Sequence, residues 1–412
     1  MKDVVNNFED EIEHVKKVDK RFKISDYLKL NEPVLFEDVD GYRALGNLWS
    51  SKKRIAKYLG INRNEIPKFI IEAQDSKEEE IKINNEESHQ STSKFSLKDL
   101  PIPTYFEGDG GPYLTPGIVI AKDPVSEIMN ASYHRMMVTG DKSATIRLVP
   151  RHLYSMKQKV KELDILIALG TPLPMLLSSA ISFEYNRDEL KVSNQIEKMS
   201  KDRNLEFIEI NNMSVPKKTE VIFEATITDE LDDEGPFVDI TGTRDEIRQQ
   251  PVVKFEKMYY KPDPVFYVLL PGGHEHFNLM GIPKEATIYE SVKNTVPEVH
   301  GVNLTSGGCS WLHGVISISK QSKGDAKNAI MGALSGHTSM KHVVAVDKDI
   351  DIHNKEEVEW AIATRFQADK DLIRVNNSRG SSLDPSRNET TSKLGFDATK
   401  PLDSDEKFER II

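Results

Sequence analysis

The region from Pro101 to about Asp263 constrains the fold of this 412-residue chain most strongly, because it consists almost entirely of short β-branched segments. Gly, Pro and Asp residues separate these segments, and one helical stretch (152–163) interrupts them. The segments read LTPGIVIAKD, ASYHRMMVTG, ATIRLVP, LDILIALG, EVIFEATIT and FYVLL. Many short strands with so few helices predict a barrel or a sandwich in the middle of the chain.

The two flanking regions alternate helices with strands. Near the N-terminus, FEDEIEHVKKV has helical spacing, PVLFEDV and YRALGNLW predict two strands around Gly41, and KKRIAKYLGI predicts a helix ending at Gly60. After Pro271, HGVISIS and KHVVAVDKDID read as strands that alternate with the helical stretches GDAKNAIMGALSGH and KEEVEWAIATRF. This order favours an α/β domain with a partly parallel sheet. We expect a solvated helix or a mobile connection at 72–94 and an extended tail from Asn376.

Composition excludes several classes of protein. The longest apolar runs, such as PVFYVLL (264–270), are far shorter than the roughly 18 residues that cross a bilayer, so no membrane span is expected. The start, MKDVVNNFEDEIEHVKK, reads as a surface helix and not as an export leader, which predicts a cytoplasmic protein. The net charge of −11 argues against a surface that coats nucleic acid, and the single cysteine, Cys309, excludes an internal disulfide.

Two polar clusters lie among the predicted strands. MNASYHRMMV places Asn130 and Arg135 five residues apart, on opposite faces of a strand unless the chain bends between them. The fork of an arginine suits a carboxylate or a phosphate, although a surface position or a structural ion pair is the more ordinary interpretation. In ATIRLVPRHL, Arg147 precedes Arg151 and His152 at a helix start, where a phosphate could bind or where the bases are simply solvated.

Two further clusters are acidic. FEYNRDELKVSN (183–194) reads by itself as a solvated helix start, even though it carries Glu189. DELDDEGPFVDITGT places Glu234 and Asp239 five residues apart across a Gly-Pro bend. Such a bend can bring two carboxylates toward one cavity, where mutual repulsion and loss of solvent favour a proton on one of them and create a general acid. An acidic loop without function is the alternative.

Two patterns resemble sites without completing them. His274 and His276 in GGHEHF have the spacing of a metal-binding pair, but no third ligand follows at a familiar distance, so we expect an active-site or structural loop. Cys309 has His313 four residues on, as a nucleophile and its base would, but a free cysteine is usually a small buried apolar residue.

Taken in order, segments across nearly the whole chain resemble the UbiD family of decarboxylases, which use prenylated FMN. NASYHRMMV resembles the family's Asn-x-x-x-x-Arg signature, and EGPFVDITG resembles its EGP-aromatic-x-acid loop. GGPYLTPGIVIAKDP resembles its glycine-tyrosine strand, and PVLFEDVDGYRALGNLW its N-terminal strand-turn segment. GGCSWLHGVISISKQ, WAIATRF and SKLGFDAT have counterparts in its C-terminal region.

The resemblance implies an α+β and α/β protein in which a central split β-barrel holds the flavin. We expect an N-terminal α/β domain (1–100), the flavin-binding barrel domain (101–270), and a C-terminal α/β domain with the extended tail (271–412). The implied metal is Mn²⁺, often accompanied by K⁺, between protein oxygens and the flavin phosphate. The implied metal ligands are Asn130, Glu189 and, in some branches, His152. The implied cofactor contacts are Tyr133, His134, Arg135, Arg147, Leu148, Val149, Arg151 and His152.

The same resemblance assigns a catalytic trio. Arg135 would hold the substrate carboxylate, Glu234 would fix Arg135, and Asp239 would deliver a proton to the carbon that loses CO₂. The modified flavin would add across the Cα=Cβ bond of the substrate and delocalise the charge left behind. A flavin-binding oxidoreductase or a non-catalytic flavin carrier is the alternative of a different class, and neither would need the three residues together.

The resemblance also bears on substrate and partners. The chain most resembles a compact archaeal branch that is linked to decarboxylation of trans-anhydromevalonate 5-phosphate in isoprenoid synthesis. A 4-hydroxy-3-polyprenylbenzoate, or another aromatic or α,β-unsaturated acid, is the alternative substrate. The resemblance further implies a flavin prenyltransferase that supplies the cofactor and a homo-oligomeric assembly.

Overall fold

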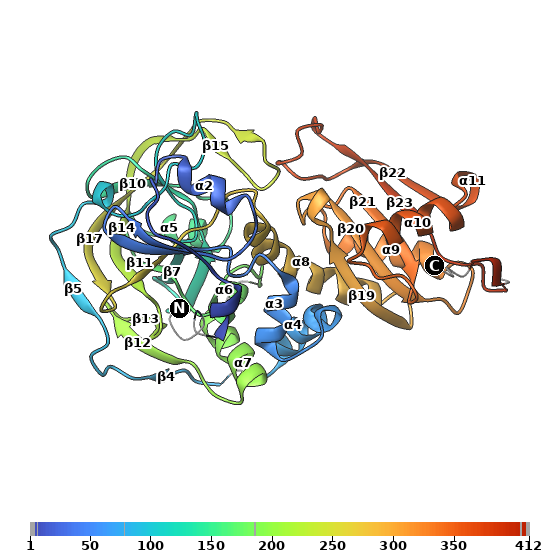
Figure 1. Ribbon diagram of the computed structural model, residues 1–412, viewed down its shortest axis with the longest axis horizontal. Coiled ribbons are helices and arrows are strands. Elements are labelled where there is room, and N and C mark those ends of the chain that lie inside the picture. The colour runs from blue at the N-terminus through green and yellow to red at the C-terminus, as the bar shows by residue number, and fades with distance from the viewer. Residues whose placement is uncertain (1–4, 6, 78, 185–186, 404–405, 409–412) are drawn as a thin grey trace. The chain divides into compact units, whose positions relative to one another are not determined.

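The computed structural model describes residues 5, 7–77, 79–184, 187–403 and 406–408. The chain forms two compact units. The first unit consists of residues 1–60 and 76–279, and the second consists of residues 61–75 and 280–412. The later boundary falls within helix α8 (His274–Lys293). Each unit combines helices with sheets (Figure 1), so the expected mixed class is confirmed. The expected domain boundaries at residues 100 and 270 stay a prediction.

A nine-stranded antiparallel sheet forms the largest part of the first unit (Figure 1). Its order is β6-β9-β10-β17-β14-β11-β7-β8, with β5 paired to β17 outside this path. Within the described ranges no pairing joins the end strands β6 and β8, so the structure shows an open sheet and not a closed barrel. The strands are β5 (Gln90–Thr92), β6 (Tyr113–Leu114), β7 (Ile118–Lys122), β8 (Met129–Tyr133), β9 (Met136–Val138), β10 (Ser143–Ile146), β11 (Leu163–Leu169), β14 (Val221–Glu234) and β17 (Arg248–Tyr260).

The long pair of β14 and β17 carries the sheet to the functional site. Its register runs from Val221 opposite Tyr260 to Glu234 opposite Arg248, with two irregular steps. β14 is mostly buried in its first half and exposed in its second half, and Glu234 at its end is buried again. The strand therefore delivers a buried carboxylate to the end of the sheet, an arrangement that is costly unless a cation meets it.

The N-terminal segment shares a second sheet with the middle of the chain. Its order is β1-β2-β3-β18, made of β1 (Glu13–Val15), β2 (Val34–Val39), β3 (Tyr42–Gly46) and β18 (Val265–Tyr267). The strand pair around Gly41 and helix α3 (Lys52–Leu59), which ends at Gly60, are confirmed. The helix expected for FEDEIEHVKKV is wrong, because a short 3-10 turn is followed by β1, which hydrogen-bonds in parallel to β2 and buries Val15. The surface helix expected over MKDVVNNFEDEIEHVKK also includes residues 1–4 and 6, which lie outside the described residues.

The remaining elements of the first unit are short, and two differ from expectation. Helix α5 (His152–Lys157) is shorter than the stretch 152–163, because the buried Lys157 ammonium donates to the carbonyls of Val160 and Lys161 and closes the chain there. The stretch 72–94 contains β4 and β5 in addition to the end of α4. The other elements are α2 (Lys23–Leu28), α6 (Leu173–Ser178), α7 (Glu189–Lys201), β4 (Lys82–Ile83), β12 (Glu206–Ile210), β13 (Met213–Pro216), β15 (Phe237–Val238) and β16 (Arg244–Asp245).

The second unit is built on a five-stranded sheet of order β19-β20-β21-β23-β22 (Figure 1). β20, β21 and β23 run parallel, whereas β19 and β22 are antiparallel edge strands. Apolar residues of α9 pack on one face of the sheet and those of α10 on the other. The expected partly parallel α/β sheet is therefore confirmed. The elements are α4 (Ile66–Asp75), β19 (Glu298–Leu304), β20 (His313–Ser319), α9 (Asp325–Gly336), β21 (His342–Asp347), α10 (Lys355–Arg365), α11 (Ala368–Asp371), β22 (Leu372–Ser378) and β23 (Thr391–Asp397).

Two further observations concern the C-terminal tail and the helices. The tail after Asn376 contains the end of β22 and all of β23, so part of it is extended as strands of the sheet, and residues 404, 405 and 409–412 lie outside the described residues. Among the helices in the described parts of the chain, none is long and apolar enough to cross a bilayer.

Candidate active site

A step between two strands presents Arg135. β8 ends and β9 begins on either side of residues 134–135, so both residues leave the regular ladder. The His134 N–H donates to the Gly117 carbonyl at 3.2 Å, and the Arg147 N–H donates to the Arg135 carbonyl at 3.1 Å. These backbone bonds fix the step against its neighbouring strands. The regular strand that would set Asn130 and Arg135 on opposite faces is thereby interrupted between them.

Three carboxylates surround the Arg135 guanidinium. Its Nε and Nη2 donate to the two oxygens of Glu234 at 2.9 and 3.0 Å. Nη1 donates to Asp239 Oδ2 at 2.5 Å, and Nη2 also donates to Asp245 Oδ2 at 2.8 Å. Four of the five guanidinium N–H groups are therefore used, and one on Nη1 remains for a ligand. The three residues singled out as a catalytic trio lie in direct contact, with Asp245 as an additional member.

The turn after β14 explains how these carboxylates converge. Gly235 follows Glu234 and has a φ of +108°, in a region that favours glycine. The chain then forms the two-stranded ladder of β15 and β16, whose register sets Phe237 opposite Asp245. Asp239 directly follows β15, and the ladder returns Asp245 to the same guanidinium.

Two aromatic rings enclose the arginine and its buried partner. The Phe237 ring centroid lies 4.3 Å from Arg135 Cζ, a distance that favours a cation–π contact. Tyr113 packs on Phe237 with ring centroids 4.5 Å apart, and its hydroxyl donates to Glu234 Oε1 at 3.2 Å. The Glu234 side chain is fully buried, whereas Asp239 keeps 20% of its side chain exposed. Of the two acids in the EGPFVD segment, Asp239 is the one that a ligand or water can reach.

The charges of the cluster restrict what can bind. Burial alone would lower the pKa of Arg135, but the hydrogen bonds and charges of Glu234, Asp239 and Asp245 raise it, so the guanidinium stays protonated. Arg248 also binds Asp245, at 2.5 Å, so two guanidiniums and three carboxylates sum to −1 when all three acids are ionised. An anionic substrate would be repelled by this charge. Binding of a carboxylate therefore requires a proton on the cluster or additional donors nearby.

The residues expected to contact a flavin form two groups. On β8 and the step, the Tyr133 hydroxyl donates to the Leu176 carbonyl at 3.1 Å. His134 places Nδ1 2.9 Å from the Arg147 carbonyl oxygen and Nε2 3.0 Å from Ser132 Oγ. Burial lowers the pKa of His134 to about 4, so its imidazole is neutral and both of its nitrogens are used within the protein.

The second group lies on the loop from β10 to α5. The Leu148 N–H donates to Gln250 Oε1 at 2.8 Å, and Arg151 Nη1 donates to Ser182 Oγ at 2.9 Å. Val149 is an apolar side chain that is 39% exposed. Burial and then the charges of Arg248 and Arg135 lower the pKa of Arg147, whereas the charges of Asp245 and Glu234 act to raise it. This loop therefore offers an uncovered apolar residue beside cationic groups, a combination suited to a flavin phosphate.

Two of the three residues expected to bind a metal are in contact. Asn130 Nδ2 donates to Glu189 Oε1 at 3.1 Å, and the Ala131 N–H donates to Glu189 Oε2 at 2.9 Å. Glu189 is 2% exposed, so the solvated helix start expected from its segment alone is wrong for this residue, because α7 packs its first turn against β8. Burial raises the pKa of Glu189 to about 8.

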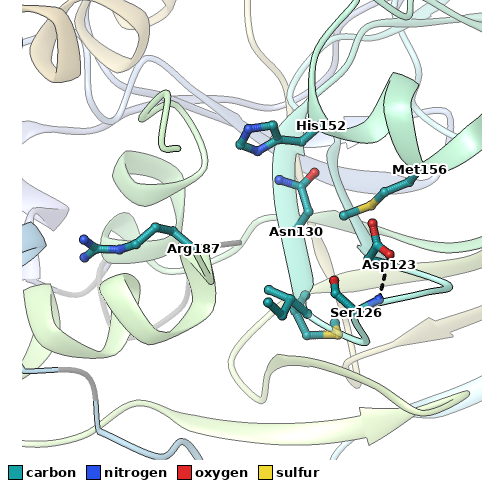
Figure 2. A pocket seen from close by; sticks show the side chains of 8 residues that line it. Asp123, Ser126, Asn130, His152, Met156 and Arg187 are labelled. Carbon is teal, nitrogen blue, oxygen red and sulfur yellow. Dashed lines mark hydrogen bonds between the residues drawn. The ribbon is translucent and has the colours of Figure 1, made fainter. Parts of the chain in front are cut away.

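His152 lines the same pocket as Asn130. Figure 2 shows the His152 ring near the Asn130 amide, in a pocket that Asp123, Ser126, Met156 and Arg187 also line. Within the described ranges no three His, Cys, Asp or Glu side chains form a cluster suited to a metal. A cation at this place would therefore draw on the Asn130 amide oxygen, the Glu189 carboxylate and the His152 ring, and would also need oxygens that a ligand brings.

Family models match almost the whole chain. Residues 7–74, 76–274 and 277–398 match the N-terminal domain, the Rift-related domain and the C-terminal domain of 3-octaprenyl-4-hydroxybenzoate carboxy-lyase. The chain belongs to the UbiD family. The family resemblance of the sequence is thereby confirmed, and the chain is placed among carboxy-lyases.

Individual relatives agree with this family. An anhydromevalonate phosphate decarboxylase of Methanocaldococcus jannaschii is 41% identical and covers 100% of this chain and 99% of its own length. One from Methanothermobacter thermautotrophicus is 43% identical, over 89% of this chain and 88% of its own. Among solved structures, the UbiD-class enzyme HmfF from Pelotomaculum thermopropionicum in complex with FMN is 33% identical, with a TM-score of 0.95 over 100% of this chain and 96% of its own. An evolved dimeric form of HmfF, in complex with prFMN, is 30% identical, with a TM-score of 0.90 over the same shares of the two chains.

Four residues were given no role of their own from the sequence. Gln250 stands in an ordinary strand pattern that carries no signal of its hydrogen bond, and Tyr113 was noted only as part of the family's glycine-tyrosine strand. Asp245 could have been found, because Gly242 between FVD and TRDE indicates a hairpin that returns an acid toward Glu234. His276 was noticed only for its spacing from His274.

The two incomplete patterns take different places. GGHEHF does not form a loop throughout, because α8 begins at His274. Cys309 is half-buried, and burial raises the pKa of its thiol, which disfavours the thiolate that a nucleophile needs.

Proposed function

We propose that this protein decarboxylates trans-anhydromevalonate 5-phosphate, with prenylated FMN as cofactor, in an archaeal type of isoprenoid synthesis. The observation that carries the proposal is the 41% identity to the Methanocaldococcus jannaschii anhydromevalonate phosphate decarboxylase over the whole of this chain. Three further archaeal proteins of that name are 41–42% identical over 76–93% of the chain. The contact of Arg135 with Glu234 and Asp239 supports the same chemistry.

The cofactor would lie along the step and the loop from β10 to α5. The residues proposed to hold it are Tyr133, His134, Arg135, Arg147, Leu148, Val149, Arg151 and His152. The HmfF structures, which contain FMN or prFMN, support this placement through their fold. When bound, prenylated FMN supplies the ring system that accepts the electrons released as CO₂ departs.

We propose Mn²⁺, accompanied by K⁺, beside the cofactor phosphate. Asn130 and Glu189 supply hard oxygen atoms, and His152 supplies a nitrogen in the pocket that Asn130 lines. The residues present fit a cation, because a carboxylate that is 2% exposed and has a raised pKa is stabilised when a positive charge replaces its proton.

The protein groups would divide the reaction as follows. The free N–H of Arg135 Nη1 would hold the substrate carboxylate, and Glu234 would keep the guanidinium oriented through its two hydrogen bonds. Asp239 accepts the other N–H of the same nitrogen, so it would lie beside the substrate carboxylate. When Asp239 is protonated, its hydrogen bond from Arg135 Nη1 is no longer strengthened by a negative charge. The protonated acid can give its proton to the carbon that has lost CO₂.

Three proposals concern the cellular setting. A flavin prenyltransferase would supply the cofactor, and the enzyme would work in the cytoplasm. A homo-oligomer is proposed because the evolved dimeric form of HmfF has the same fold.

A 4-hydroxy-3-polyprenylbenzoate remains the alternative substrate, because the matched family models take their description from such an acid.

The experiment compares acids on one enzyme preparation. The protein is purified after co-expression with a flavin prenyltransferase, and bound prenylated FMN is established by mass spectrometry. The kcat/KM for the phosphorylated acid should exceed by orders of magnitude the values for its unphosphorylated form, cinnamate and a polyprenylbenzoate. Equal or better turnover of the polyprenylbenzoate would make the alternative the better account. Absence of decarboxylation of every acid by the loaded enzyme would contradict the class itself.

A further inference from the structure

Strand β17 begins with an arginine that has no part in the reaction proposed above. Arg248 stands opposite Glu234 in the ladder of β14 and β17, and opposed residues of an antiparallel pair project from the same face. Gln250, two residues further along the strand, shares that face and accepts the Leu148 N–H of the loop from β10 to α5. Arg248 therefore leaves β17 on the face that carries the buried glutamate and borders the proposed cofactor loop.

One carboxylate joins Arg248 to the arginine that would hold the substrate. Asp245 Oδ1 accepts from Arg248 Nη1 at 2.5 Å, and Asp245 Oδ2 accepts from Arg135 Nη2 at 2.8 Å. Two guanidiniums that share one carboxylate in this way lie within about 10 Å of each other. Asp245 thereby limits the separation of the two cations.

Arg248 keeps donors for a ligand. Its Nη1 also donates to the Glu246 carbonyl at 3.2 Å, so both N–H groups of this nitrogen are used. Within the described ranges Nε and Nη2 have no protein partner, which leaves three of the five N–H groups. The Arg248 side chain is 34% exposed, whereas that of Arg135 is 9% exposed. A doubly charged anion at Arg248 therefore keeps part of its hydration, which lowers the cost of binding it.

A second cation lies near Arg248. Burial lowers the pKa of Arg147 most, and the charge of Arg248 lowers it next, which places the two guanidiniums close together. Arg147 is half-buried on the loop proposed for the cofactor, so Arg248 is the one of the pair that remains for the substrate. The presence of both cations favours an anionic group beyond the carboxylate that Arg135 would hold.

We propose that Arg248 binds the phosphate of the substrate through Nε and Nη2, and that it thereby selects phosphorylated acids. The proposal rests on the proposed decarboxylase function and deepens it. The edge formed by Nε and Nη2 is the one through which Arg135 holds Glu234, and such a planar fork also matches two phosphate oxygens.

The length of the substrate agrees with this placement. The carboxylate carbon and the phosphorus of trans-anhydromevalonate 5-phosphate are six bonds apart, which spans about 7 Å in an extended chain. This span is comparable to the separation that Asp245 allows between Arg135 and Arg248. One molecule can therefore place its carboxylate at Arg135 and its phosphate at Arg248.

The test compares the phosphorylated and the unphosphorylated acid on the full chain loaded with prenylated FMN. Arg248→Met removes the fork, and the ratio of kcat/KM for the phosphorylated acid to that for the unphosphorylated acid should fall about 10- to 100-fold, the worth of hydrogen bonds between charged groups. Arg248→Lys keeps the charge without the fork and should recover part of this loss. Lys254→Met is the matched control, because it removes a cation of the same strand that pairs with the exposed Glu230, and it should change the ratio less than about twofold.

A binding measurement provides a readout apart from turnover. Calorimetric titration of Asp239→Asn enzyme, with and without Arg248→Met, should show that affinity for the phosphorylated acid falls about 10- to 100-fold more than affinity for the unphosphorylated acid. An equal loss for both acids would show that Arg248 acts only through Asp245 and Arg135, and would overturn the proposal. An unchanged affinity for the phosphorylated acid would overturn it as well. If the wild-type enzyme decarboxylates no acid, or does not prefer the phosphorylated one, the proposed function fails instead, and the two failures are thereby distinguished.

Discussion

Glu234 binds Arg135 through both carboxylate oxygens, at 2.9 and 3.0 Å, from a position with no solvent exposure. A bidentate pair of this kind fixes the plane of the guanidinium as well as its place. The Tyr113 hydroxyl adds a third hydrogen bond to Glu234, so the carboxylate is held from two directions. The consequence is an arginine whose remaining N–H points in one defined direction, which is the requirement for positioning a substrate carboxylate.

Glu234→Gln tests this positioning role. The amide NH₂ would face a guanidinium N–H, so Arg135 loses one hydrogen bond and its buried counter-charge. We expect kcat/KM for the acid to fall about 10- to 100-fold, with a raised KM. Steady-state kinetics on the loaded enzyme measure this. Glu230→Gln is the matched control, because Glu230 is an exposed acid of the same strand that pairs with Lys254. An unchanged KM in Glu234→Gln would contradict the role.

Asp245→Asn tests whether the third carboxylate stabilises the fold in a pH-dependent way. Burial acts to raise the pKa of Asp245, but hydrogen bonds from Arg248 and Arg135 lower it below its ordinary 3.8. A lowered folded-state pKa stabilises the protein above the unfolded value, and this stabilisation is lost as pH falls through the folded value. The stability difference between wild type and variant should therefore be present at pH 7 and shrink below about pH 4.

The measurement is urea unfolding followed through Trp49, with Trp311 and Trp360 replaced by Phe so that only the first unit is observed. Asp26→Asn is the control, because Asp26 is an exposed acid whose ion pairs contribute little. A stability difference between wild type and Asp245→Asn that grows as pH falls would show that folding raises the pKa of Asp245 and does not lower it.

Glu189→Gln tests the proposed cation site. The variant removes the carboxylate charge but keeps the shape, so it should reduce bound Mn²⁺ and prenylated FMN more than it reduces folding. Metal analysis and the flavin absorbance of the purified protein report the two occupancies. Glu197→Gln is the control, because Glu197 is a buried acid of the same helix that binds Arg203 and Tyr58 instead. Full occupancy of both groups in Glu189→Gln would contradict the assignment.

Local patterns in the sequence predicted much of this fold. The strands of the middle region and the helix–strand alternation of the second unit follow from β-branched runs, Gly and Pro positions and helical spacing. The region before β2 was mispredicted, because a parallel pairing with a distant strand overrides helical spacing. Lys157 likewise ended its helix through contacts that spacing does not register.

Less of the candidate site than of the fold could be predicted from the sequence. Composition and spacing left Glu234 and Asp239 as an acidic loop or an acid pair, and only the family resemblance joined them to Arg135. The structure adds that the two acids do not face each other across a cavity, since the guanidinium lies between them. Tyr113 comes from a segment whose approach to Glu234 depends on strand register, which cannot be read from that segment alone, whereas the hairpin around Gly242 did carry a signal for Asp245.

The central claim is that Asp239 delivers the proton to the carbon that loses CO₂. The decisive measurement is decarboxylation of trans-anhydromevalonate 5-phosphate in D₂O by wild type and by Asp239→Asn, with deuterium in the product determined by mass spectrometry. The wild type should place one deuterium on that carbon. The variant should bind substrate and cofactor but lose turnover by about 10²- to 10⁴-fold, together with the labelling. An Asp239→Asn enzyme that stays substantially active and still labels its product would contradict the account and would make Glu234, or a water held by it, the donor.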